Sequence, residues 1–248
     1  MKLPHFAGVL LIPVMNAASA QYLSPTEYRS FASPDAGSAI SPFASIQFDQ
    51  FHLEDFEDGS LDTPGVTLRE AADVGLTTTY SDSVDGDDGV IDGWASGATK
   101  SLFSDFRTST FTFDFSAESL GGRLPTHAGI VWTDIGRNNG GTPLAADLVS
   151  NVIFEAFDAD GVSLGMFGPF SVGDSSISRS TPEDRFFGVV HIDGISTIRI
   201  SMPGKNNWEV DHLQYGIAPV PEPLSTAMLL AGIPLVLLSA GIRGRTTA

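Results

Sequence analysis

Short runs in which apolar and polar residues alternate recur along the middle of the chain, and they limit the fold more than any other feature. In TFTFDF, residues 110–115, phenylalanines occupy every second position, which is the period of a β-strand with one buried face. Similar runs between turn residues continue through residues 43–218, and no segment there shows a helical period over about eleven residues. About nine or ten strands at this spacing predict an all-β fold, an antiparallel jelly-roll-like β-sandwich over residues 43–218.

Glycine-bearing turns divide these runs. Asp158-Ala159-Asp160-Gly161 stands between NVIFEAFD and VSLGMFG and predicts a β-hairpin. Asp193-Gly194 stands between FFGVVHI and STIRIS and predicts a second turn. NWEVDHLQYG is the last candidate strand. Residues 21–42 are rich in Ser, Ala and Pro and lack periodicity, so we expect an irregular lead-in there, either poorly ordered or a first irregular strand.

The N-terminus has the pattern of a secretory signal peptide. Lys2 supplies a positive charge, residues 6–14 form an apolar stretch too short to span a membrane, and Ala18-Ser19-Ala20 is a small-residue cleavage site. We therefore expect residues 1–20 to be removed after export through the general secretory machinery. They are left out of the fold prediction.

The C-terminal region has an uncharged apolar stretch over residues 224–242. Nineteen helical residues extend about 28 Å, close to the ~30 Å hydrocarbon core of a bilayer. Arg243 and Arg245 follow at once, and positive charge beside a span favours the cytoplasmic side. The pattern predicts a single transmembrane helix with the preceding domain outside. The alternative, a buried core helix, would show a polar face, and this stretch has none.

The motif before this stretch resembles a known sorting signal. Val220-Pro221-Glu222-Pro223, the apolar stretch with Gly232, and the terminal arginines are similar in content and order to the PEP-CTERM signal over residues 219–248. The resemblance implies recognition by exosortase, a membrane-embedded cysteine protease of Gram-negative bacteria that make extracellular polysaccharide. The two prolines hold the backbone extended, as a protease substrate requires. We expect the tail to be a transient membrane anchor that is then cleaved.

The central region also resembles, loosely, an uncharacterised family of β-sandwich domains common in PEP-CTERM proteins. The resemblance rests on LEDFEDG…TPGVT, LPTHAGIVWTDIG and WEVDHLQYG and covers residues 53–216. It implies an architecture like that of carbohydrate-binding modules. The motifs that carry the resemblance have no known catalytic or binding role.

Charge and cysteine content exclude several classes of protein. Residues 21–219 hold ten basic and 29 acidic residues, a net charge of −19, which disfavours nucleic acid and anionic lipid as partners. The chain has no cysteine, so it forms no disulfides and is no lipoprotein. Stability must come from the core or from bound metal.

Two acidic groups suggest Ca²⁺ as the candidate cofactor. If the first and last strands pair, as in many jelly rolls, their carboxylates could form a clamp; its ligands would be Glu57, Asp58 and Asp211. The alternative for these residues is turn capping and bonds to backbone amides. DSVDGDDGVIDG is the second candidate, with Asp85, Asp87 and Asp92 as ligands, although it departs from the EF-hand pattern and also suits a solvated loop.

Catalytic patterns are weak, and we predict no catalytic residues. Gly161-Val162-Ser163-Leu164-Gly165 matches the nucleophile-elbow motif but follows a hairpin turn, and no helix can begin after it. The histidines at 52, 127, 191 and 212 are too far apart in sequence to indicate zinc. Candidate carboxylate pairs for glycoside cleavage come from four strand residues, Glu54, Glu57, Glu155 and Glu209.

Aromatic residues could instead stack on the rings of a sugar. The candidates are Trp94, Trp132, Trp208 and Tyr215, each equally suited to a core. We therefore expect an exported cell-surface or extracellular-matrix protein that is non-catalytic and either structural or glycan-binding, with extracellular polysaccharide as a candidate partner. The alternative is a glycan-active hydrolase of the cell envelope or exopolysaccharide.

Overall fold

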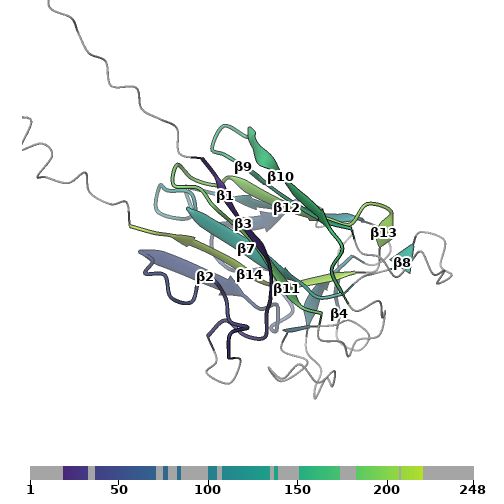
Figure 1. Cartoon of the computed structure of the whole chain (residues 1–248). Coiled ribbons are helices and arrows are strands. Elements are labelled where there is room, and N and C mark those ends of the chain that lie inside the picture. The colour runs from purple at the N-terminus through teal and green to yellow at the C-terminus, as the bar shows by residue number, and fades with distance from the viewer. Residues whose placement is uncertain are drawn as a thin grey trace, which may run out of the picture.

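The computed structural model describes residues 19–32, 37–70, 75–77, 83–84, 100–104, 108–134, 137–138, 151–173, 183–206 and 208–219 (Figure 1). Fourteen strands occur among these residues, and no α-helix does. Every pair of these strands is antiparallel. The predicted all-β class and antiparallel pairing are therefore confirmed for the described part of the chain.

The strands form two large sheets and one small sheet. The seven-stranded sheet has the order β1 (Gln21–Glu27), β11 (Arg185–Val190), β7 (His127–Trp132), β14 (Glu209–Ile217), β5 (Ser101–Phe103) and β4 (Gly75–Thr77), with β2 (Gln50–Glu54) also paired to β14. The five-stranded sheet has the order β10 (Ser163–Phe170), β9 (Val152–Phe157), β12 (Thr197–Ser201), β6 (Thr110–Phe115) and β3 (Val66–Leu68). The small sheet pairs β13 (Lys205–Asn206) with β8 (Arg137–Asn138).

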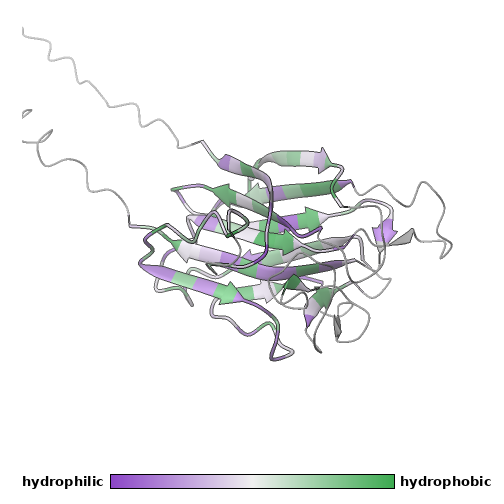
Figure 2. Cartoon of the chain, turned by 60° about the horizontal axis from the view of Figure 1, so that its bottom comes forward, coloured by the Kyte–Doolittle hydropathy of each residue, from purple (hydrophilic) through white to green (hydrophobic). Residues whose placement is uncertain are grey.

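The two large sheets pack face to face around a shared hydrophobic core. Phe111 and Phe113 of β6 are completely buried, as the alternation in that strand predicts. The ring of Phe111 lies 4.6 Å from that of Trp208, next to β14, and Phe115 lies 5.0 Å from Tyr215 of β14. Complete burial of one such phenylalanine stabilises the fold by about 2 kcal/mol. Hydrophobic and hydrophilic residues alternate along the strands (Figure 2). Hydrophobic residues from both sheets form one buried cluster, so the two sheets make a sandwich-like arrangement.

The two predicted turns have different places in this arrangement. Residues 158–161 join β9 and β10 in one sheet, so the predicted hairpin is confirmed. Asp193-Gly194 also forms a turn, but it joins β11 and β12, which belong to different sheets. A turn motif between two strand-like runs therefore predicts a reversal of the chain without specifying whether the runs pair.

The start of the expected lead-in, residues 21–27, forms a first irregular strand, which is one of its two expected forms. This strand, β1, pairs with β11 at five of its seven residues and has one register shift, between Leu23 and Thr26. Pro25 lies at this shift, where a missing backbone N–H costs no ladder hydrogen bond. The packed domain therefore begins near residue 21, and the boundary expected at residue 43 falls inside it.

Residues 28–32 and 37–48 then form a layer over the outer face of the seven-stranded sheet. Tyr28 stacks on Phe186 of β11 at 6.1 Å, and Phe43 meets the same ring edge-on at 5.2 Å. Both rings belong to a second buried cluster with Val131 and Val84. The seven-stranded sheet is thus covered on both faces, which the alternating pattern of its strands does not predict.

Strand β14 is the centre of this sheet and is buried at all nine positions. One edge pairs with β7, and the other pairs with β2 and β5. The register to β7 shifts between Asp211 and Gln214, and His212 there has a φ of 41°. This bulge turns both Asp211 and His212 away from the core, while Val210 and Leu213 on either side face into it.

The two predicted terminal segments lie outside the described residues, apart from Ser19 and Ala20 of the signal peptide and Pro219 before the sorting motif. Within the described part of the chain, no helix has the length and apolar character needed to cross a membrane.

Candidate functional site

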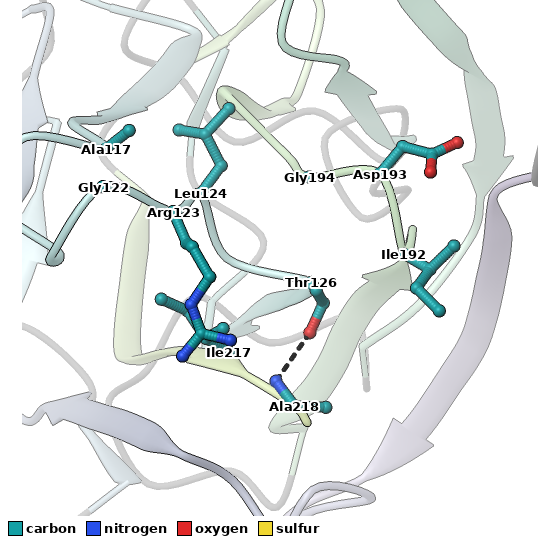
Figure 3. A pocket seen from close by; sticks show the side chains of 10 residues that line it. All are labelled: Ala117, Gly122, Arg123, Leu124, Thr126, Ile192, Asp193, Gly194, Ile217 and Ala218. Carbon is teal, nitrogen blue, oxygen red and sulfur yellow. Dashed lines mark hydrogen bonds between the residues drawn. The ribbon is translucent and has the colours of Figure 1, made fainter. Parts of the chain in front are cut away.

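A hollow of about 360 Å³ lies at one end of the sandwich (Figure 3). It is bounded by the loop between β6 and β7, the turn between β11 and β12, and the last residues of β14. Both connections cross from one sheet to the other, so the hollow opens between the sheets. The lining residues are Ala117, Gly122, Arg123, Leu124, Thr126, Ile192, Asp193, Gly194, Ile217 and Ala218.

The turn at the rim of the hollow depends on a glycine. Gly194 has a φ of 104° and donates its N–H to the carbonyl of His191 at 3.1 Å. A side chain there would strain the backbone, and its Cβ would lie 3.0 Å from the Cβ of Leu124 on the opposite wall. The Asp-Gly motif therefore sets both the turn and the close approach of the two loops.

The described lining of the hollow contains one cation, Arg123, one carboxylate, Asp193, and several apolar side chains. Arg123 pairs with Asp49 at 2.9 Å, and about two fifths of each side chain stays exposed. Leu124 and Ile217 supply apolar surface, and Asp193 lies on a different side from Arg123 (Figure 3). This set of side chains suits a small, partly apolar group that carries a negative charge.

Thr126 ties the hollow to the end of the last strand. Its Oγ1 accepts the N–H of Ala218 at 2.9 Å and lies 2.9 Å from Nδ1 of His127. Burial lowers the pKa of His127, whose ring meets Phe43 edge-on at 5.4 Å. The imidazole is thus neutral at pH 7, and the hydroxyl is engaged in structural bonds.

A second group of polar side chains lies buried on the outer face of the seven-stranded sheet. Ser41 donates its hydroxyl to Oε1 of Gln214 at 2.5 Å, and Nε2 of Gln214 donates to the hydroxyl of Tyr28 at 2.9 Å. The same hydroxyl lies 2.9 Å from Nδ1 of His212. All four residues are buried, so we interpret the network as the polar contact that holds residues 28–32 and 37–48 on the sheet.

The predicted calcium clamp is not supported. The strand that precedes Glu57, β2, does pair with the last strand, β14, although the first strand of the fold, β1, pairs with β11. Glu57, however, accepts the N–H of Lys100 at 2.7 Å, and Asp58 accepts that of Ser60 at 2.7 Å. Asp211 is completely buried and accepts three bonds, from Oγ of Ser83 and N–H of Val84, both at 2.9 Å, and from N–H of His212 at 2.7 Å.

No three His, Asp or Glu side chains are placed to hold a metal ion anywhere in the described ranges. The three clamp residues are therefore in the alternative arrangement, turn capping and amide bonding. Asp85, Asp87 and Asp92 lie outside the described residues, so calcium in that loop stays a prediction.

The candidate catalytic carboxylates have separate structural partners. Glu54 is buried and accepts the N–H groups of Phe56, Asp62 and Thr63 at 3.0–3.2 Å, which holds the turn after β2. Glu155 lies on the other sheet, where it accepts the hydroxyl of Ser163 at 2.6 Å and pairs with Arg199. Glu209 is buried at the start of β14, and Glu57 binds the amide of Lys100 as described above.

Ser163 of the elbow-like motif begins β10 and donates its hydroxyl to Glu155 at 2.6 Å. A nucleophile elbow requires a strand, a sharp turn and a helix, whereas here a hairpin turn leads into a strand. The geometry of a serine hydrolase is therefore absent at this motif.

Three of the four candidate stacking aromatics have the alternative position, in the core. Trp132, Trp208 and Tyr215 are 0–1% exposed and lie in the core. Burial raises the pKa of Tyr215 to about 12, and its hydroxyl donates to the carbonyl of Pro64 at 2.6 Å. Trp94 lies outside the described residues.

The outer face of the five-stranded sheet carries a polar surface that no sequence motif predicts. We call this the ladder face, and its members are Arg69, Asp114, Glu155, Phe157, Met166, Thr197 and Arg199. Cross-strand registers place Met166 beside Glu155, and Glu155 beside Arg199. The guanidinium of Arg199 lies 5.2 Å from the centre of the Phe157 ring. Ring and planar polar groups thus lie together on a sheet surface.

Comparison with known proteins adds no assignment. No family model matches the chain, and a search of curated proteins finds no match.

Proposed function

We propose that this protein is an exported, non-catalytic surface module with a structural or glycan-binding role. It is delivered by the general secretory machinery, held by its C-terminal helix, and released after exosortase cleaves the PEP-CTERM-like signal. It then lies on the cell surface or in the matrix, with extracellular polysaccharide as its partner. The connections that cross between the sheets also favour a jelly-roll-like topology related to carbohydrate-binding modules.

The position of the two chain ends is the observation that carries this proposal. Gln21 is in register with Val190, Val190 with His127, and His127 with Gly216. The start of β1 and the end of β14 therefore lie at the same end of the seven-stranded sheet (Figure 1). An anchor attached there leaves the opposite end and both sheet faces directed away from a membrane.

The engagement of the carboxylates supports a non-catalytic role. A glycosidase needs two carboxyl groups on opposite sides of one cleft, about 5–10 Å apart. Glu54 is committed to backbone amides beside one sheet, and Glu155 to Arg199 on the other. The ladder face is the better surface for a sugar, because Phe157 offers a ring and Arg199 offers planar donors.

Export and processing are tested by mass spectrometry of protein extracted from the host surface. We expect the dominant form to begin near Gln21 and to end near Glu222. A dominant form that retains peptides from Leu224 onward would leave a permanent membrane anchor in place of a processed signal.

Glycan binding is tested on an array with the extracted protein. We expect Phe157→Ala and Arg199→Ala to lose the signal, and we expect the control Val162→Ala, on the exposed hairpin, to retain it. Thermal melting of each variant separates lost binding from lost folding. If the wild type binds no glycan, the structural role remains.

A further inference from the structure

The C-terminal segment leaves the folded domain from the wall of the hollow. Ile217 and Ala218 line the hollow, and the bond from Ala218 to Thr126 fixes the backbone there. Pro219 follows, exposed, as the last described residue. The next residues, Val220-Pro221-Glu222, therefore begin one residue away from this hollow.

The composition of that segment matches the hollow. Val220 and Pro221 are apolar, as are Leu124 and Ile192 in the hollow, and the side chain of Ile192 is 46% exposed. Glu222 is the only acidic residue after Asp211. The described lining holds one positive charge, Arg123, and one negative charge, Asp193, which lies on a different side of the hollow from Arg123 (Figure 3).

The reach and the available donors also agree. Glu222 is four residues after Ala218, and an extended chain spans about 13 Å over four residue steps. The hollow, at about 360 Å³, is at the small end of ligand pockets and suits a short peptide stretch. Asp49 accepts from one terminal nitrogen of Arg123, and a guanidinium offers five N–H donors in total, so a second carboxylate can bind.

We propose that the hollow is a docking site for the chain's own segment Val220–Glu222. Val220 and Pro221 pack against Leu124 and Ile192, and the Glu222 carboxylate pairs with Arg123. The fixed φ of the prolines lowers the entropy cost of docking. Docking places two residues of the Pro-Glu-Pro motif, Pro221 and Glu222, against the domain. The docking itself requires no processing, because residues 220–222 precede the expected cleavage point.

Disulfide trapping tests this proposal cleanly, because the natural chain has no cysteine. The full chain in detergent micelles carries Ile192→Cys with Val220→Cys, and the control carries Val162→Cys, also exposed, with Val220→Cys. Under mild oxidation we expect the 192–220 pair to form an intramolecular bond about tenfold faster or more, because docking raises the effective concentration of the two thiols. Peptide mass spectrometry identifies the bond.

Two further variants separate docking from simple proximity. Arg123→Gln in the 192–220 background should slow trapping, and the matched Arg69→Gln, another exposed ion-paired arginine, should not. Equal rates for the 192–220 and 162–220 pairs would overturn the proposal. So would trapping that is insensitive to Arg123→Gln, or bonds that form only between molecules, which would indicate a second copy as the occupant. Melting curves verify that every variant is folded.

Discussion

The two large sheets share one core but differ on their outer faces. On the five-stranded sheet, Asp114 and Arg199 lie outward, and over a third of each side chain is exposed. On the seven-stranded sheet, Asp211 and Gln214 also lie outward but are completely buried, because residues 28–32, 37–48 and 83–84 cover them. The same alternation of apolar and polar residues thus occurs in a sheet whose outer face is exposed to solvent and in a sheet whose outer face is buried.

The difference shows what a polar residue requires in each place. On a covered face, each donor and acceptor must find a partner inside the protein, because an unpaired buried group costs about 1–3 kcal/mol. Asp211 meets this need with three hydrogen bonds. On the exposed face water can replace a lost partner, so equivalent bonds contribute less.

The largest expected effect is a difference in the free energy of unfolding between variants of two outward carboxylates, Asp211 and Asp114. Asp211→Ala leaves the amides of Val84 and His212 without their acceptor, so we expect a loss of about 3 kcal/mol or more in the free energy of unfolding. For a domain of this size that lowers the Tm by about 6–12 °C. Asp114→Ala removes contacts to Arg69 and Thr197, and we expect a loss of about 1 kcal/mol or less.

Thermal melting in EDTA and in millimolar calcium adds a control to this pair. We expect the cost of Asp211→Ala to be the same in both, because the carboxylate is held by donors of the protein. A wild-type gain in calcium that Asp211→Ala abolishes would restore the clamp. Equal costs for Asp211→Ala and Asp114→Ala would remove the distinction between the sheets.

A smaller effect concerns pH and the covered sheet. Burial among Phe43 and Phe48 lowers the pKa of His127 in the folded state. As pH falls below about 6.5, the unfolded chain takes up the proton first, so this site lowers stability in acid and has no effect well above that pH. Urea unfolding at pH 7.5 and 5.5 should show a smaller acid loss in His127→Gln than in the wild type. If His127→Gln and the wild type lose the same free energy of unfolding between pH 7.5 and 5.5, groups other than His127 cause the acid sensitivity.

The smallest expected effect is on the ladder face. Arg69 binds Asp114 through two nitrogens, at 2.7 and 3.0 Å, but 60% of its side chain is exposed. Water screens such a pair, so Arg69→Gln should change the free energy of unfolding by about 0.5 kcal/mol or less. Equilibrium urea unfolding measures this, with Asp114→Ala as the partner variant. A loss of several kcal/mol in the free energy of unfolding would mean that hydrogen bonds on this exposed face contribute as much to stability as those on the covered face of the seven-stranded sheet.

Local patterns account for the part of the fold that was predicted correctly. The alternation in residues 110–115 identifies β6 and its buried face, and the Asp158–Gly161 turn identifies a hairpin, because both depend on neighbours in sequence. The covering of β14 by residues 28–32 and 37–48 depends on contacts between distant segments, so no sequence period predicts it. For the same reason, Trp132 and Trp208 could not be assigned to core or surface from sequence.

The candidate sites were predicted less well than the fold. The hollow is formed by two loops and a strand end that meet only after both sheets pack, and its lining residues form no spaced motif. The ladder face requires the registers of β9, β12 and β10, which sequence alone does not supply. The acidic residues of the expected clamp were correctly placed near paired strands, but their bonds to amides are invisible in composition.

The position of β14 also decides the order in which the protein can fold. Its residues, 209–217, come last among the described strands, yet they separate β7 from β2 in the middle of the sheet. Until they arrive, β7 and β2 each present an unpaired edge, and long-range pairings of this kind form slowly. Under the export proposed above, the chain would have to keep these edges from other partners until almost all of its sequence had crossed the membrane.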